Sequence, residues 1–502
     1  MRIDGLHDYQ ITAATHLCAC LGRDGGALDG SDMGTGKTYV AAGVLRHLDL
    51  PSLVVCPEVA ETGWRRAGEH LGTEFDVIGY EMLRTGRTPF GRWEFPKVGR
   101  LKTRLKCLTC QCFVPEIGPA PRCPYDPAGI HCVEVKTIPH NYGEFIFNPG
   151  VRALVFDEVH RCGAPDSLNA EMLLAARRQG IAALGLSATA GDSPLKFRAL
   201  GAVLGLHSGD RQPTFWPWAR KYNCRPSPHG GFYFAGKEAD RRLIMARLNG
   251  EIFPEHGVRV RIADLGPGVF PECQITAELY DLGQNKAIEK LYVQMDEAIR
   301  ELHSKSALDK SPELAVTKIL RALQEIELLK VPVFVQLTED ALAQGYSVAL
   351  FVSYTQTLNE LCKQLKTECR IDGSQVGPAG KKRRSDCVDS FQAGTDRVIV
   401  ANSAAGGICL SLHDTRGDSP RLGLVSPCSS AVNIRQVFGR LPRIGGKSPS
   451  LYRVVLAAGT REEATHRRLV PKLNQLDALN DADLFSSNLD LTERDLSSIF
   501  RA

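Results

Sequence analysis

Short apolar runs alternate with longer stretches of helical spacing between residue 25 and about residue 205. The runs SLVVCP, ALVFDE and AALGLSAT have the length and composition of buried strands. Strands that are apolar throughout and separated by helices are typical of a parallel sheet covered on both faces. The pattern therefore predicts one α/β domain in this part of the chain.

A second alternating series begins near Tyr346. Its predicted strands are SVALFVSY, DRVIVANS, RLGLVSP and LYRVVLA. The chain is therefore expected to contain two α/β units in tandem.

The segment between the two series differs from them in composition and in the spacing of its apolar residues. From Tyr280 to about Gln344 there are few Gly or Pro residues, and apolar positions recur at helical spacing, which predicts long connecting helices. The expected organisation is a first lobe over 1–205 with an insertion at 92–140, a basic, aromatic and helical inter-lobe region over 206–344, a second lobe over 345–470 and a helical tail over 471–502.

The composition is that of an ordinary globular protein. Of the 502 residues, 43% are hydrophobic and 24% are charged, which excludes a disordered, collagen-like or coiled-coil chain. The 61 Lys and Arg against 57 Asp and Glu leave a net charge of +4, too close to balance to identify a polyanionic partner. The N-terminus lacks the pattern of a secretory signal, and no apolar run approaches the roughly 20 residues that cross a bilayer. We therefore expect a soluble, cytoplasmic protein that does not associate with membranes.

A glycine-rich loop at Ser31–Thr38 follows an apolar, strand-like segment and precedes a helical stretch. Glycines let backbone N–H groups wrap phosphate oxygens, a lysine reaches the terminal phosphates, and a threonine hydroxyl can hold Mg²⁺. Ser31 replaces the first glycine of the P-loop pattern, and the alternative is a glycine-rich turn beside a surface lysine. The predicted nucleotide-binding residues here are Gly34, Thr35, Gly36, Lys37 and Thr38.

Two adjacent carboxylates, Asp157 and Glu158, end an apolar strand about 120 residues after this loop. In P-loop hydrolases one acid at this place orients Mg²⁺ and the next polarises the attacking water. We assign these roles to Asp157 and Glu158, respectively. An exposed acidic pair at a strand end is the alternative.

The order of motifs resembles that of the superfamily 2 helicases, and more narrowly that of the Swi/Snf-type DNA translocases. Leu6, Tyr9 and Gln10 resemble the element that reads adenine. The resemblance continues with the following motifs: Asp157-Glu158-Val159-His160, Ser187-Ala188-Thr189, Asp372-Gly373, Phe391-Gln392, Ala405-Gly406-Gly407, and Gln436 through Arg443.

This resemblance implies two RecA-like parallel-sheet lobes with ATP and Mg²⁺ in the cleft between them. Gln436, Arg440 and Arg443 would then act from the second lobe, with Arg443 as the arginine finger and Arg440 supporting it. The alternative is that these arginines form surface salt bridges.

Two further motifs depart from the family pattern. Cys409 and Ser411 stand where a glycine and an asparagine are common, and Ser187-Ala188-Thr189-Ala190 lacks the form frequent in remodellers. The departures favour a divergent branch, viral or bacterial.

Five of the 16 cysteines lie close together in the insertion of the first lobe. Thiolates at this spacing suit a structural, tetrahedral Zn²⁺ site that would hold a loop-rich segment. Cys112 or His131 could replace one ligand, and unrelated thiols are the alternative. The predicted ligands are Cys107, Cys110, Cys123 and Cys132.

Three basic segments are candidate phosphate contacts. Residues 92–106 carry six basic residues and one acid, residues 211–261 carry ten and four among several aromatic residues, and Lys381–Arg384 is a short basic run. Solvated basic surfaces, and aromatic residues that belong to the core, are the alternatives.

Together these features predict an ATP-driven translocase on double-stranded or branched DNA, acting in fork or junction remodelling or branch migration. The expected partners are DNA and replication or recombination proteins, and the expected state is a monomer. The alternative hypotheses are an RNA helicase and a nucleic-acid-binding scaffold without ATPase activity.

Overall fold

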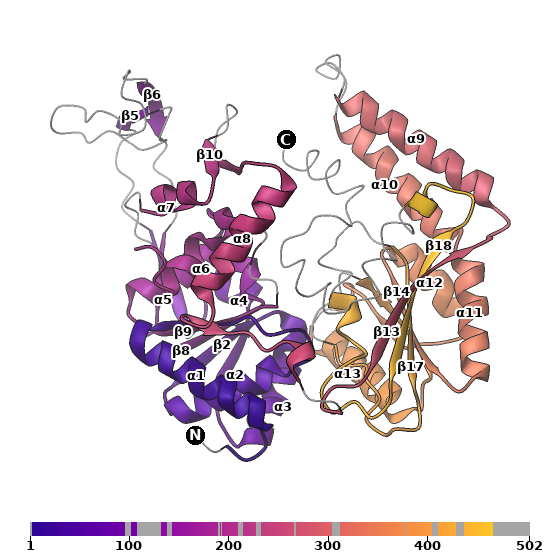
Figure 1. Ribbon diagram of the computed structural model, residues 1–502, viewed down its shortest axis with the longest axis horizontal. Coiled ribbons are helices and arrows are strands. Elements are labelled where there is room, and N and C mark those ends of the chain that lie inside the picture. The colour runs from indigo at the N-terminus through magenta and orange to yellow at the C-terminus, as the bar shows by residue number, and fades with distance from the viewer. Residues whose placement is uncertain are drawn as a thin grey trace. The chain divides into compact units, whose positions relative to one another are not determined.

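The computed structural model describes residues 3–95, 102–107, 132–137, 143–188, 191, 193–208, 214–226, 232–265, 268–303, 312–375, 377–403, 410–427 and 436–464. The chain divides into two compact units (Figure 1). The first consists of Met1–Ser31 and Lys37–Arg259, and the second of Asp32–Gly36 and Val260–Ala502. Each unit contains a six-stranded sheet in which every pairing is parallel. The prediction of two tandem α/β units is confirmed.

The sheet of the first unit has the strand order β12-β1-β9-β8-β2-β3. The neighbouring strands β8 and β2, both inside the sheet, are buried along their whole length, as their apolar sequences predict. The strands are β1 (Gly26–Asp29), β2 (Ser52–Cys56), β3 (Asp76–Gly79), β8 (Ala153–Asp157), β9 (Ala182–Leu186) and β12 (Gly257–Val258). The helices that accompany them are α1 (Asp8–Asp24), α2 (Lys37–Leu48), α3 (Glu61–Leu71), α4 (Tyr80–Arg84), α5 (Leu168–Arg178) and α6 (Arg198–Val203).

The sheet of the second unit has the strand order β13-β18-β17-β14-β16-β15. Its strands are β13 (Cys273–Tyr280), β14 (Ser347–Val352), β15 (Arg370–Ile371), β16 (Val398–Asn402), β17 (Arg421–Val425) and β18 (Ser450–Ala457). Along β14, Leu350 belongs to one apolar cluster and Phe351 to another. Successive residues of a strand point to opposite faces, so both faces of this sheet are apolar and need a helical cover.

Helices supply that cover in the second unit. The helices are α9 (Asn285–His303), α10 (Pro312–Leu328), α11 (Val331–Ala343), α12 (Thr355–Gln364) and α13 (Gly377–Ala393). Phe334 of α11 and Leu358 of α12 pack into the Leu350 cluster, whereas Phe391 of α13 packs into the Phe351 cluster. Helices α9 and α10 pack against each other through a third apolar cluster (Figure 1). In the described ranges, no helix combines the length and apolarity that a membrane crossing needs.

The segment predicted to separate the lobes contributes a strand to each sheet. The division between the units falls at Arg259 and Val260. Strand β12 pairs with β1 before this point, and β13 pairs with β18 after it. The sequence analysis expected neither strand, because β12 has only two residues and β13 is an edge strand without a continuous apolar run. The predicted helices at 280–344 are present as α9, α10 and α11, and the predicted tail at 471–502 lies outside the described residues.

Short antiparallel ribbons accompany the first sheet. Strands β4 (Gly91–Glu94) and β7 (Glu144–Phe147) form one pair, and β10 (Cys224–Pro226) and β11 (Phe232–Phe234) form another, between α7 (Phe215–Lys221) and α8 (Glu238–Ile252). A third ribbon, β5 (Lys102–Cys107) with β6 (Cys132–Thr137), lies in the predicted insertion.

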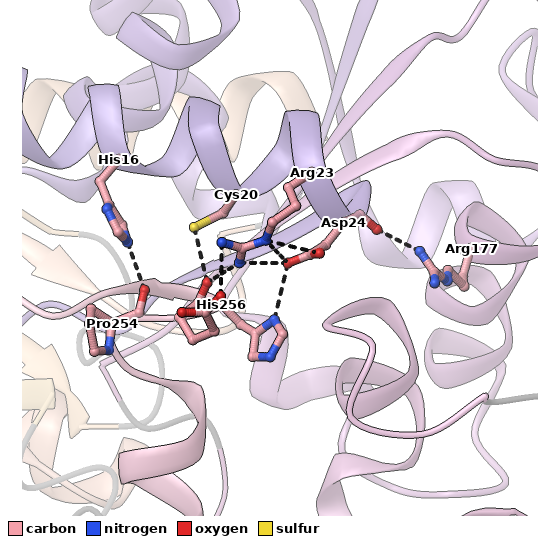
Figure 2. Close-up of polar contacts among 8 residues, drawn as sticks. His16, Cys20, Arg23, Asp24, Arg177, Pro254 and His256 are labelled. Carbon is pink, nitrogen blue, oxygen red and sulfur yellow. Dashed lines mark hydrogen bonds and ion pairs between the residues drawn. The ribbon is translucent and has the colours of Figure 1, made fainter.

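Polar contacts fasten the edge strand β12 to α1 (Figure 2). Arg23 forms an ion pair of 2.9 Å with Glu255, and His256 Nδ1 lies 3.2 Å from Asp24 Oδ2. The hydrogen bond from Arg23 holds the pKa of Asp24 below its usual value. These contacts surround the chain just before it enters β12, so they fix this end of the sheet.

In the second unit, a buried ion pair joins α11 to the end of β18. Lys330 Nζ lies 2.7 Å from both carboxylate oxygens of Glu462, and the two side chains are only 1% and 4% exposed. Glu462 also accepts hydrogen bonds from Tyr292 and from the backbone N–H of Ala457. The carboxylate therefore ties α9, α11 and the sheet together.

Replacing Lys330 by Met should lower the free energy of unfolding of the second unit by about 3–5 kcal/mol, because it leaves a buried carboxylate without its cation. Urea denaturation of the variant measures this change. The double variant K330M/E462Q should recover part of the loss. If K330M unfolds at the same urea concentration as the parent protein, the ion pair does not stabilise the unit.

Candidate active site

The glycine-rich loop connects the end of β1 to the start of α2. Gly34 and Gly36 have φ angles of +84° and +85°, a region that residues with a Cβ rarely adopt, so both positions need glycine. Lys37 is the first residue of α2, and its Nζ donates a hydrogen bond of 2.7 Å to the carbonyl oxygen of Ser31. The N–H groups at the N-terminus of α2 favour an anion, and the first turn contains no acidic residue that would compete for them.

A buried acid lies directly before this loop. Asp29 ends β1, and its Oδ1 accepts a hydrogen bond of 2.9 Å from the backbone N–H of Ser31. Burial raises the pKa of Asp29, while the positive charge of Lys37 and the bonds from Ser31 oppose that rise. The sequence analysis did not single out Asp29, although an acid within the apolar strand GALD is a signal that could have drawn attention to it.

The two predicted carboxylates lie at the end of β8. Burial, and then the nearby charge of Glu158, raise the pKa of Asp157 to about 6. The indole N–H of Trp64 donates to Asp157 Oδ2 at 2.9 Å, and the backbone N–H of Glu158 donates to Oδ1 at 3.0 Å. The Tyr80 hydroxyl donates to the carbonyl oxygen of Asp157 at 2.9 Å. Sequence reasoning missed Trp64 and Tyr80, because both are far from Asp157 in the chain and look like ordinary core aromatics.

Glu158 has a left-handed backbone, with a φ angle of +53°. This conformation costs a residue with a side chain about 1–2 kcal/mol, and such strain is concentrated at functional sites. His160 Nδ1 lies 3.2 Å from Glu158 Oε2 and 3.1 Å from Ser187 Oγ. A proton on Nδ1 can be donated to either oxygen, so His160 links the Glu158 carboxylate to the segment after β9.

The predicted adenine-reading residues lie at the start of α1. The backbone N–H of His7 donates to Gln10 Oε1 at 3.0 Å, which caps the helix, and the rings of His7 and Tyr9 stack with centroids 6.0 Å apart. Burial raises the pKa of Tyr9 well above its usual value, so its hydroxyl stays neutral.

The remaining predicted catalytic residues belong to the second unit. Gln436 and Arg440 are buried, and Arg440 Nη1 donates to the carbonyl oxygen of Leu410 at 3.4 Å. Arg443 is half-buried. Burial, and then the charge of Arg443, lower the pKa of His413 to about 4, so this histidine is neutral at pH 7. That Gln436, Arg440 and Arg443 act on ATP stays a prediction.

Comparison with known proteins identifies the family. No protein-family model matches the chain. A protein of Acanthamoeba polyphaga mimivirus, named as an ATP-dependent RNA helicase, is 30% identical over 498 residues, which cover 95% of this chain and 84% of that protein. RAD54-like DNA repair and recombination proteins match smaller parts. The one from Drosophila virilis is 30% identical over 161 residues (31% of this chain, 19% of that protein), and the one from Drosophila mojavensis is 33% identical over 160 residues (30% and 19%). The chain belongs to the superfamily 2 helicases.

The residues of the first unit fit the magnesium nucleotide that these helicases use. The first turn of α2 would offer its backbone N–H groups and Lys37 to the phosphates of ATP, while the Thr38 hydroxyl and the Asp157 carboxylate are hard oxygen ligands of the kind that Mg²⁺ prefers. When bound, Mg²⁺ neutralises negative charge on the phosphate oxygens. Glu158 is adjacent to Asp157 and linked to His160, and its role in orienting a water molecule for attack on the terminal phosphate stays a prediction.

A zinc site in the helicase is not supported by the described side chains. Among them, no group of three or more His, Cys, Asp or Glu residues could hold a metal ion. The predicted ligands Cys110 and Cys123, and their alternatives Cys112 and His131, lie outside the described residues. The backbone register pairs Cys107 of β5 with Cys132 of β6, which brings the two ends of the cysteine-rich segment together.

Replacing Lys37 by Ala or Glu158 by Gln should reduce steady-state ATP hydrolysis by at least about 100-fold, measured as phosphate release, since each change removes a group expected to act on the phosphates or on the attacking water. Binding of a fluorescent ATP analogue should weaken in K37A and persist in E158Q. The control is the variant E81Q. It changes an acid whose side chain is 59% exposed, and it should hydrolyse ATP at the normal rate. Normal hydrolysis by E158Q would refute the role assigned to Glu158.

Proposed function

We propose that this helicase uses ATP hydrolysis to move on double-stranded or branched DNA. The observation that carries the proposal is the similarity of about 160 residues to RAD54-like proteins, whose names assign them to DNA repair and recombination. The long helices α9 and α10 after the first sheet agree with the resemblance to Swi/Snf-type translocases. We therefore place the enzyme in fork or junction remodelling or branch migration.

RNA unwinding is the second candidate function. The mimivirus relative is named as an RNA helicase, and its similarity covers 95% of this chain. The proposed ATP site does not distinguish the two substrates, because the residues around Lys37, Asp157 and Glu158 would contact nucleotide rather than nucleic acid. The choice between DNA and RNA depends on the surfaces that track the backbone.

Two basic regions supply candidate phosphate contacts. Lys382 and Arg383 are exposed on α13. In the aromatic region, Phe215 and Trp218 are buried and belong to the core, whereas Tyr233 is 47% exposed and lies opposite Arg225 across the ribbon of β10 and β11. Exposed cations beside an aromatic ring can bind phosphates and stack on a base without reading sequence.

We further propose that the cysteine-rich insertion holds a structural Zn²⁺ ion. The pairing of Cys107 with Cys132 at the end of a two-stranded ribbon would bring two of the four thiolates to one place, with Cys110 and Cys123 supplied by the intervening segment. The basic residues of the ribbon strands would then lie along a stem that the metal fixes.

ATP turnover should rise severalfold with forked, four-way or blunt duplex DNA and much less with single-stranded or duplex RNA. The measurement is phosphate release across this panel, together with strand rearrangement on labelled forks and junctions. K37A serves as the control, because it should show no stimulation by any nucleic acid. Stimulation by RNA alone would establish the RNA enzyme in place of the DNA translocase, and turnover that no nucleic acid changes would favour the scaffold.

Elemental analysis of the purified protein should give about one zinc per chain. The variants C107S and C132S should each lose most of this metal, because three thiolates hold zinc less tightly than four. C18S is the matched control, since Cys18 lies in α1 and should leave the zinc content unchanged. A zinc-free parent protein would remove the metal site from the proposal.

A further inference from the structure

Trp64 is a buried aromatic residue with a polar contact that packing alone does not explain. It lies in the first half of α3, on the face that also carries the buried residues Ala67 and Leu71. Its ring is 0% exposed and meets Phe75 edge-on, with centroids 5.8 Å apart and planes at 86°. Its indole N–H points to Asp157 Oδ2 at 2.9 Å, across 93 residues of sequence.

This contact helps to define the orientation of the Asp157 carboxylate. Oδ2 accepts a hydrogen bond from the indole N–H of Trp64, and Oδ1 accepts one from the backbone N–H of Glu158. Each carboxylate oxygen can accept about two hydrogen bonds or ligands, so each retains the capacity for one more. Because the two donors come from different elements, they hold the plane of the carboxylate and decide which direction its remaining lone pairs face.

The backbone of Asp157 is held independently of its side chain. The Tyr80 hydroxyl donates to the Asp157 carbonyl oxygen, and β8 lies between β2 and β9 in the sheet. Loss of the Trp64 hydrogen bond would therefore leave the main chain in place and the carboxylate held only by the backbone N–H of Glu158. An indole N–H donates and cannot accept, so Oδ2 must be the acceptor in this contact.

We propose that Trp64 is a positioning residue for magnesium: its N–H orients the Asp157 carboxylate so that the remaining lone pairs face the metal or the water molecules around it. Partners in the outer shell of a metal site typically change metal affinity or activity by 10–100-fold when they are removed. The inference rests on the ATPase assignment and is independent of whether the helicase acts on DNA or on RNA.

The variant W64F keeps an aromatic ring and removes only the donor. At a fixed concentration of a fluorescent, non-hydrolysable ATP analogue, it should need about 10–100-fold more Mg²⁺ for half-maximal metal-dependent binding than the parent protein. The half-saturating Mg²⁺ concentration for ATP hydrolysis should rise with it, while kcat at saturating Mg²⁺ should fall much less. Both measurements are made without nucleic acid, so they do not depend on the DNA proposal.

Two further variants separate the hydrogen bond from packing. F75L loosens the contact on the Trp64 ring and keeps the indole N–H, so its Mg²⁺ requirement should match that of the parent protein. W64H fills less of the pocket and keeps a ring N–H, so it should need less Mg²⁺ than W64F. Equal Mg²⁺ requirements in W64F and the parent protein, or in W64F and F75L, would overturn the proposal, as would a greater requirement in W64H than in W64F.

Discussion

The buried carboxylate of Asp157 interacts with three separate parts of the first unit. A carboxylate removed from water is stable only when it receives hydrogen bonds or faces a positive charge. Trp64 from α3 and the backbone of Glu158 supply the bonds, and the charge of Lys37 lies close enough to oppose the effect of burial on its pKa. Helix α3, the turn at Glu158 and the start of α2 therefore all lie near the end of β8.

The balance of charge in this region explains why nucleotide and metal belong together. Asp29 and Asp157 are both buried acids whose pKa values the positive charge of Lys37 lowers against the effect of burial. Phosphates that bound without a metal would compete with these acids for one lysine. A divalent cation adds the positive charge that phosphates and carboxylates can share, so the magnesium nucleotide fits the site better than free ATP does.

The sequence predicted the strands inside the two sheets well, because these strands carry a local signal, whereas the roles of the motif residues stay predictions. Strands such as β8 and β14 are apolar throughout, and burial on both faces requires this. The edge strands β12 and β13 carry no such signal. Their position is determined by pairing with a parallel partner on one side, and this pairing does not require an apolar sequence. Trp64 was missed for a related reason: its contact with Asp157 joins residues far apart in the chain, and no spacing rule connects them.

Two departures from the family motifs, Ser31 and Ser411, make a contact through the main chain. Ser31 replaces a glycine, yet it is not among the described residues with a positive φ angle, and its carbonyl oxygen accepts the Lys37 hydrogen bond. Any residue can offer that oxygen, whereas Gly34 and Gly36 cannot be exchanged without strain. Ser411, in place of an asparagine, likewise contributes its carbonyl oxygen, which accepts from Gln392 at 2.7 Å. Motif positions that make their contact through the backbone can therefore change in sequence while the contact persists. A divergent helicase can in this way keep the geometry of its site.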